Sequence, residues 1–150
     1  MRYVDLDGVL ADLDSWLLEK NPNALHCNEV YRTIAENYKA CFLESKPIEQ
    51  NFYLLEGEYR ILTSLPKTKR LIQFLELGMI DEVLRTLYNN KLEWCSKYNI
   101  PLTNVIICLS SEDKLKYCTK EDILYDDYLK TVQEWNRIGK GVYIESRRKK

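Results

Sequence analysis

The sequence contains a single histidine, His26, and it lies far from any motif that suggests chemistry. Metal sites built on imidazole and Ser-His-Asp triads both depend on histidine, so this scarcity argues against them. The five cysteines are widely spaced and form no Cys-x-x-Cys pair, which argues against a zinc knuckle and a disulfide framework. The sequence also shows no signal peptide and no long apolar run, so we expect a cytoplasmic protein in a reducing setting.

An excess of charge of one sign is lacking as well. Lysine and arginine number 22, aspartate and glutamate 23, and the net charge is -1. Nucleic-acid polymers and anionic membranes attract proteins with a basic surface, so we expect neither as a partner. The basic run 147–150 predicts only a solvated tail. With 150 residues, 45% of them hydrophobic, the chain suits one compact domain with room for a small insertion.

Five short apolar segments, rich in β-branched or aromatic residues, predict strands at 2–5, 59–63, 104–109, 122–125 and 141–145. Helical patterns separate them at 67–77, 81–98 and 129–138, and in the second the apolar residues recur with a period close to 3.6. Gly78 is expected to end the first helix and Gly139 to cap the last. The alternation predicts an α/β fold, here a Rossmann-like parallel five-stranded sheet with helices on both faces.

The segment 13–58 interrupts this alternation. Its pattern is mostly helical, Pro22 and Pro47 break it, and it is too long for a simple crossover between two strands. We therefore predict a small helical cap, residues 13–58, inserted after the first strand. Residues 1–12 and 59–150 would form the core.

Charged and hydroxyl side chains follow the predicted strands at their carboxyl ends. In an open parallel sheet these ends meet at one edge, and ligands bind there. Asp5 and Asp7 point to the same side of their strand, and two carboxylates so close repel each other unless a cation or a shared proton lies between them. We expect the whole set to converge: Asp5, Asp7, Thr63, Ser64, Lys114, Asp126 and Asp127.

Each member of this set also has an ordinary structural explanation. The Asp-x-Asp-Gly stretch could be a turn, and the hydroxyl pair could cap the next helix. The lysine could be a solvated loop residue, and the second acidic pair could cap the helix that follows it. Their order at successive strand ends favours a functional site.

This ordered set resembles the four motifs of the haloacid dehalogenase-type (HAD) phosphohydrolase superfamily. The motifs read Tyr3-Val-Asp-Leu-Asp-Gly-Val9, Ile61-Leu-Thr63, Lys114 and Ile123-Leu-Tyr-Asp-Asp127. Within the superfamily, Asp7-Gly-Val-Leu-Ala-Asp12 is similar to the 5'(3')-deoxyribonucleotidases and their small bacterial and phage-type relatives. Gly139-Lys-Gly141 stands where two adjacent glycines are usual, and Lys116 is a second candidate for the third motif, although Lys114 fits the spacing better.

The resemblance implies a Mg²⁺-dependent phosphomonoesterase that works through an aspartyl-phosphate. Asp5 would be the nucleophile, and Asp7 would be the general acid and then the general base. Mg²⁺ would be held by Asp5, the backbone carbonyl of Asp7, and Asp126, with Asp127 in support. The substrate phosphate would bind to Thr63, Ser64 and Lys114, and Lys114 would also offset charge between Asp5 and the phosphoryl group.

The implied substrate is a small phosphomonoester, in particular a (deoxy)nucleoside monophosphate. The cap offers polar side chains for a base and sugar, namely Lys20, Arg32, Lys39 and Lys46. It also offers aromatic side chains that could stack on a base or could form the core of a small helical bundle: Trp16, Tyr31, Tyr38, Phe42, Phe52 and Tyr53. Both interpretations of these aromatics stay open at the level of sequence.

Three alternatives remain beside this interpretation. The substrate could be another small phosphoester or the 3' phosphate of a polynucleotide, and near-neutral charge disfavours the polynucleotide. The chain could also keep the fold as a binding protein without turnover, because fold does not fix function. The oligomeric state, a homodimer included, is open.

Overall fold

The computed structural model describes residues 1–26 and 28–146, and the predicted basic tail, 147–150, lies outside this range. Its centre is a five-stranded sheet with the order β5-β4-β1-β6-β7, and every pairing within it is parallel. The predicted α/β fold with five parallel strands is confirmed. The strands are β1 (Arg2–Val4), β4 (Arg60–Ser64), β5 (Val105–Cys108), β6 (Ile123–Asp126) and β7 (Lys140–Tyr143).

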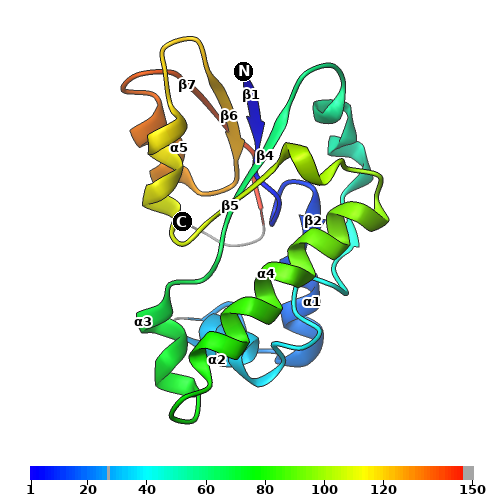
Figure 1. Ribbon diagram of the computed structural model, residues 1–150, viewed down its shortest axis with the longest axis vertical. Coiled ribbons are helices and arrows are strands. Elements are labelled where there is room, and N and C mark those ends of the chain that lie inside the picture. The colour runs from blue at the N-terminus through cyan, green and yellow to red at the C-terminus, as the bar shows by residue number, and fades with distance from the viewer. Residues whose placement is uncertain (27, 147–150) are drawn as a thin grey trace.

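The strand order reverses at β1. The chain passes from β1 to β4 and β5 on one side, and returns to place β6 and β7 on the other. In such sheets the crevice for ligands opens at the carboxyl ends beside the reversal. Figure 1 shows these ends pointing toward the helices α1, α2 and α3.

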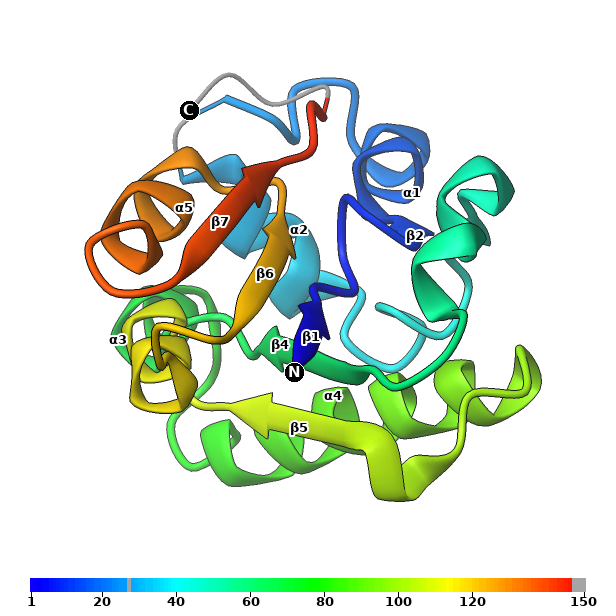
Figure 2. The ribbon, with the colours of Figure 1, turned by 90° about the horizontal axis from the view of Figure 1, so that it is seen from above.

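Successive residues of each strand point to opposite faces of the sheet, and both faces carry apolar side chains. Val4 and Ile61 pack with Trp94 of α4 (Ile80–Lys97) and with the 3-10 helix η1 (Glu49–Leu55). Leu62, on the opposite face, packs with Trp135 of α5 (Leu129–Trp135) and with the 3-10 helix η4 (Ser111–Tyr117). In Figure 2 the sheet separates α5 from the carboxyl-terminal part of α4, so helices cover both faces as predicted.

The segment 13–58 is mainly helical, as expected, but it also holds a short strand that the sequence did not predict. Its elements are α1 (Leu13–Lys20), α2 (Glu29–Glu36), β3 (Lys46–Pro47) and η1. β3 pairs antiparallel with β2 (Ala11–Asp12), which ties residues 46–47 to the chain just before the segment begins. Asp12 also caps α1, because its carboxylate accepts hydrogen bonds from Ser15 N at 3.1 Å and Ser15 Oγ at 2.6 Å.

Helices α1 and α2 share an apolar cluster with residues that lie outside 13–58. Leu17 and Ile34 meet Leu71 of α3 (Thr68–Leu71), and Val83 and Leu87 of α4 join the same cluster. The first half of α4 therefore packs against α1 and α2, and the second half packs against the sheet. Among the described residues, no helix combines the length and apolar character that a membrane span requires.

Two helix ends differ from the prediction. The first predicted helix, 67–77, is the short α3 followed by the 3-10 helix η2 (Ile72–Phe74), and Gly78 with φ 87° forms the turn before α4. The last predicted helix ends at Trp135 with Asn136 at its C-cap, so the role predicted for Gly139 is wrong. Gly139 instead allows close packing, since a Cβ there would lie 2.7 Å from the carbonyl oxygens of Thr119 and Asp122.

Replacing Gly139 by alanine should destabilise the fold, because the backbone carbonyls that the new Cβ would meet cannot turn away. We expect Gly139→Ala to lower the free energy of unfolding by about 1–3 kcal/mol, measured by equilibrium urea denaturation. Gly57→Asn is the control, since φ at Gly57 is 72°, a region that asparagine tolerates, and nothing lies within 4 Å of a Cβ there. Equal stability of the two variants would contradict the packing role of Gly139.

Candidate active site

One cleft of about 320 Å³ opens at the carboxyl ends of the strands, beside the reversal in strand order. Its walls contain every site residue predicted from the sequence: Asp5, Asp7, Thr63, Ser64, Lys114, Asp126 and Asp127. Five of these seven, all except Asp7 and Ser64, are buried. The fold thus brings together side chains that are more than a hundred residues apart in the sequence.

The sharp turn after β1 carries Asp7 to a position beside Asp5. The amides of Leu10 and Ala11 both donate hydrogen bonds to the carbonyl oxygen of Leu6, at 2.9 and 3.0 Å. Gly8 at the apex has φ 86°, and a Cβ on it would collide with the carboxylate of Asp127. Glycine is therefore required here for two reasons, the left-handed backbone and the close approach of an acidic side chain.

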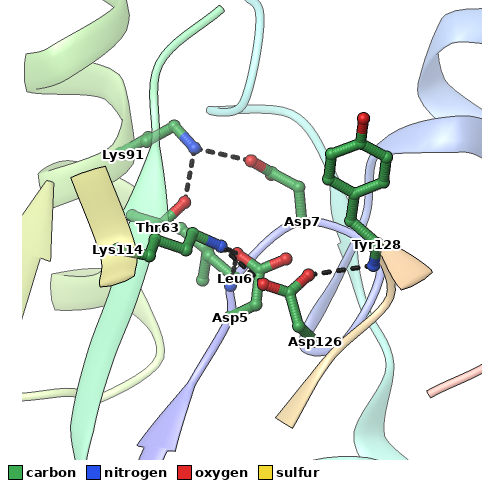
Figure 3. Close-up of polar contacts among 8 residues, drawn as sticks. All are labelled: Asp5, Leu6, Asp7, Thr63, Lys91, Lys114, Asp126 and Tyr128. Atoms are coloured by element: carbon green, nitrogen blue, oxygen red, sulfur yellow. Dashed lines mark hydrogen bonds and ion pairs between the residues drawn. The ribbon is translucent and has the colours of Figure 1, made fainter. Parts of the chain in front are cut away.

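Lys114 links the two strands that carry the acidic residues (Figure 3). Its Nζ lies 3.0 Å from Asp5 Oδ1 and 2.8 Å from Asp126 Oδ2, and all three side chains are buried. The amide of Leu6 donates to Asp5 Oδ1 at 2.8 Å, and the amide of Tyr128 donates to Asp126 Oδ1 at 3.0 Å. Backbone and lysine donors together fix the orientation of both carboxylates.

The structure distinguishes between the two lysines that the sequence offered. Lys116 has a side chain that is 76% exposed and pairs with Asp113 at 3.1 Å. Lys114, by contrast, is buried between the carboxylates of the cleft. Only Lys114 is in a position to act on a group bound there.

Asp5, Lys114 and Asp126 shift one another's pKa values. Burial and the neighbouring Asp5 carboxylate raise the pKa of Asp126 to about 7. Burial would also raise the pKa of Asp5, but the Lys114 ammonium, the hydrogen bond to Asp126 and the Lys91 ammonium together lower that pKa below its ordinary value. Burial opposes the charge of Lys114, yet the two carboxylates raise its pKa. Asp5 is therefore ionised at neutral pH, and Asp126 is the carboxylate that takes up a proton.

Three carboxylates of the cleft could hold a metal ion. Asp5, Asp126 and Asp127 each place one oxygen within 4.8 Å of the others, and all three are buried. Carboxylate oxygens suit hard divalent cations, and a cation would offset the repulsion that raises the pKa of Asp126. The donor set therefore fits a hard cation.

Lys91, on α4, belongs to the site and was missed from the sequence. Its side chain is fully buried, and its Nζ donates to Asp7 Oδ2 at 2.6 Å and to Thr63 Oγ1 at 2.7 Å (Figure 3). The sequence could have indicated that Lys91 is buried. It follows Leu87 by four residues, so the helical period places it on the apolar face of the helix rather than on the solvated face.

Aromatic and aliphatic side chains form part of the cleft walls. Of the six aromatic residues named from 13–58, Tyr31 and Phe42 line the cleft, Trp16 is buried in the cluster with α2, and Tyr53 is 59% exposed. Some of these aromatics thus line the cleft, where they could contact a ligand, and others pack in the core of the helical segment. The guanidinium of Arg70 lies 5.5 Å from the centroid of the Tyr31 ring.

The polar side chains expected from the cap do not line the cleft. In the described part of the chain its basic wall residues are instead Lys67 and Arg70, from the segment after β4, and the buried Lys114. Lys67 pairs with Glu112 at 2.8 Å, and Arg70 Nη1 donates to Asn28 Oδ1 at 2.8 Å. Lys20, Arg32, Lys39 and Lys46, which the sequence offered for a base and sugar, are not among the residues that line the cleft.

Comparison with known proteins gives no match, either to the models of protein families or to the curated proteins. The function must therefore be argued from the chemistry of the cleft, because a fold of this kind hosts many activities.

A divalent cation that binds the carboxylate cluster should displace a proton. Asp126 must be ionised to act as a ligand, and below its pKa, near 7, protons compete with the cation. Mg²⁺ affinity measured by titration calorimetry should therefore rise roughly tenfold from about pH 6 to about pH 8.

Two variants provide the comparison. Asp126→Asn has no proton to lose and should bind weakly at both pH values, whereas Asp113→Asn, which alters a surface ion pair, should behave as the wild type. A wild-type affinity that does not change with pH would contradict the assignment.

Proposed function

We propose that the protein is a Mg²⁺-dependent phosphomonoesterase of the HAD type, acting on a (deoxy)nucleoside monophosphate through an aspartyl-phosphate. The observation that carries the proposal is the convergence on one cleft of a buried Asp5 held by Lys114, a second carboxylate two residues later, a strand-end hydroxyl and a cluster of three carboxylates. Phosphoryl transfer requires a nucleophile, an acid for the leaving group and positive charge around the phosphoryl oxygens. The cleft offers a candidate for each.

The reaction would proceed in two displacements. A carboxylate oxygen of Asp5 would bond to phosphorus while the ester P–O bond breaks, and Asp7 would give a proton to the departing alkoxide. Asp7 would then take a proton from water as the water oxygen attacks phosphorus and the bond to Asp5 breaks. Inorganic phosphate leaves, and both side chains return to their first state.

Cations of the site would offset the charge of the phosphoryl group. Lys114 would contact a phosphoryl oxygen from its position 3.0 Å from Asp5, with the Thr63 and Ser64 hydroxyls as further donors. Mg²⁺, held by Asp5, Asp126, Asp127 and the carbonyl of Asp7, would supply Lewis-acid charge at the same oxygens. Lys91 would stabilise the anion that Asp7 becomes after it has given up its proton.

The walls beyond the phosphate position favour a flat, partly apolar leaving group. Tyr31 lines the cleft with Val30, Ile34 and Tyr128, and the guanidinium of Arg70 lies beside Tyr31. Aromatic side chains stack on nucleobases, which supports a nucleotide over a sugar phosphate. Activity measurements distinguish this proposal from its alternatives. Another small phosphoester or a polynucleotide 3' phosphate would be hydrolysed in preference to a nucleotide, and a binding protein would show no turnover.

Asp5→Asn tests the nucleophile. The amide cannot form the acyl-phosphate at a useful rate, so kcat for an aryl phosphate with added Mg²⁺ should fall by roughly 10⁴-fold or more while the circular dichroism spectrum stays unchanged. Asp81→Asn, on the exposed first turn of α4, is the control and should keep wild-type turnover. A folded Asp5→Asn variant with substantial activity would refute the role of Asp5, and a wild-type protein inactive on a panel of nucleotides and sugar phosphates would refute the proposed function.

Tyr31→Ala tests the substrate class. If the ring stacks on a base, kcat/KM for a nucleoside monophosphate should fall roughly 10- to 200-fold, while hydrolysis of a small aryl phosphate should change much less. Tyr53→Ala removes an exposed aromatic from the same segment, outside the cleft walls, and should leave both substrates unaffected. Equal losses on both substrates would show that Tyr31 does not recognise a base.

A further inference from the structure

Lys91 is a buried cation in the middle of a helix whose buried face is otherwise mainly apolar. Its neighbours along that face include Val83, Leu87, Trp94 and Cys95. The side chain has no exposed surface, and its Nζ contacts Asp7 at 2.6 Å and Thr63 at 2.7 Å. Both contacted side chains line the cleft, whereas Lys91 itself does not reach its wall.

Fold stability alone gives a weak reason for this lysine. Removing an ammonium and a carboxylate from water is costly, and apolar residues of similar volume often replace a buried ion pair without loss of stability. Leu87, one turn earlier, shows that this helix face packs with such residues. The contacts of Lys91 point to the geometry of the cleft instead.

The donor count at Lys91 fixes the direction of the Thr63 hydroxyl. A lysine ammonium has three hydrogens and no lone pair, so Thr63 Oγ1 must accept the hydrogen bond between them. The proton of that hydroxyl is then available for donation to another group. A phosphate dianion offers only acceptors, so a hydroxyl held in this way is suited to bind it.

Phe42 covers the remaining side of the ammonium. Its ring centroid lies 4.2 Å from Lys91 Nζ, at a distance that suits a cation–π contact. The backbone of Phe42 has φ 69°, a left-handed conformation that residues other than glycine rarely adopt. Backbone strain of this kind persists where the surrounding structure holds the residue in place. Carboxylate, hydroxyl and ring together surround the ammonium and keep water away from it.

We propose that Lys91 is a positioning residue of the active site, which holds the Asp7 carboxylate in place and directs the Thr63 hydroxyl proton toward the substrate phosphate. This inference rests on the proposed phosphomonoesterase function. Lys91 acts through two side chains and does not contact the substrate. Its loss should therefore weaken phosphate binding through Thr63 and slow turnover through Asp7.

Lys91→Met removes the charge and the donors while nearly keeping the volume. With Mg²⁺ present, we expect the Kd of inorganic phosphate, measured by calorimetry, to rise roughly 10- to 100-fold, and kcat for an aryl phosphate to fall by a similar factor. Lys97→Met is the matched control, a lysine on the exposed side of the same helix, and should stay within about twofold of wild type on both measures.

A double-mutant cycle separates positioning from a general structural effect. Thr63→Val removes the hydroxyl and should weaken phosphate binding about as much as Lys91→Met does. If Lys91 acts through Thr63, the double variant should bind phosphate no more than about threefold more weakly than Thr63→Val alone. Fully multiplicative losses would overturn the inference.

Lys91→Met removes the ammonium that pairs with Asp7, and this loss could prevent the variant from folding. A second pair of variants tests the inference without that risk. Asp7→Asn and Asp7→Asn/Lys91→Met differ only in the lysine, and in the double variant both members of the pair are uncharged. Its phosphate affinity should be roughly 10- to 100-fold lower than that of Asp7→Asn, and equal affinities would overturn the inference. A wild type that neither binds phosphate nor turns over any phosphoester refutes the proposed function itself, whereas an active wild type with Lys91→Met equal to Lys97→Met refutes only the role of Lys91.

Discussion

Asp5, Asp126 and Asp127 place three carboxylates within 4.8 Å of one another in a buried site, and like charges at that distance repel strongly. The surrounding structure offsets part of this repulsion. The 3-10 helix η4 brings the Lys114 ammonium between Asp5 and Asp126, and backbone amides donate to the same two carboxylates. Gly8, by having no side chain, leaves room for Asp127 against the turn after β1. The Lys91 ammonium, paired with Asp7 at 2.6 Å, adds a second positive charge that helps to lower the pKa of Asp5.

The parts of the fold that could be predicted are those that depend on local pattern. The five strands were found because each is a short apolar run, and α4 was found within a residue at each end because its apolar residues follow the helical period. The seven site residues were found because they follow strand ends in a fixed order, and a parallel sheet brings strand ends together. Their roles in catalysis stay predictions.

What could not be predicted depends on contacts between distant segments. The β2–β3 pair is two residues long on each side and carries no pattern of its own. The closeness of Gly139 to the carbonyls of Thr119 and Asp122 is a property of how α5 packs on the sheet. For the same reason the sequence could not tell that Tyr31 faces the cleft while Tyr53 faces away, or that Lys91 meets Asp7 across 84 positions of the chain.

Helix α4 belongs to two apolar clusters at once. Val83 and Leu87 pack with α1 and α2, and Trp94 and Cys95 pack beneath β1 and β4. A lid that swings needs a flexible joint, but here a continuous helix of 18 residues crosses between the two clusters. Helices α1 and α2 cannot move away from the strand ends without losing contacts to α4 or carrying α4, and with it Lys91, along. Helix α4 therefore ties the segment that carries α1 and α2 to the sheet through packed side chains on both sides.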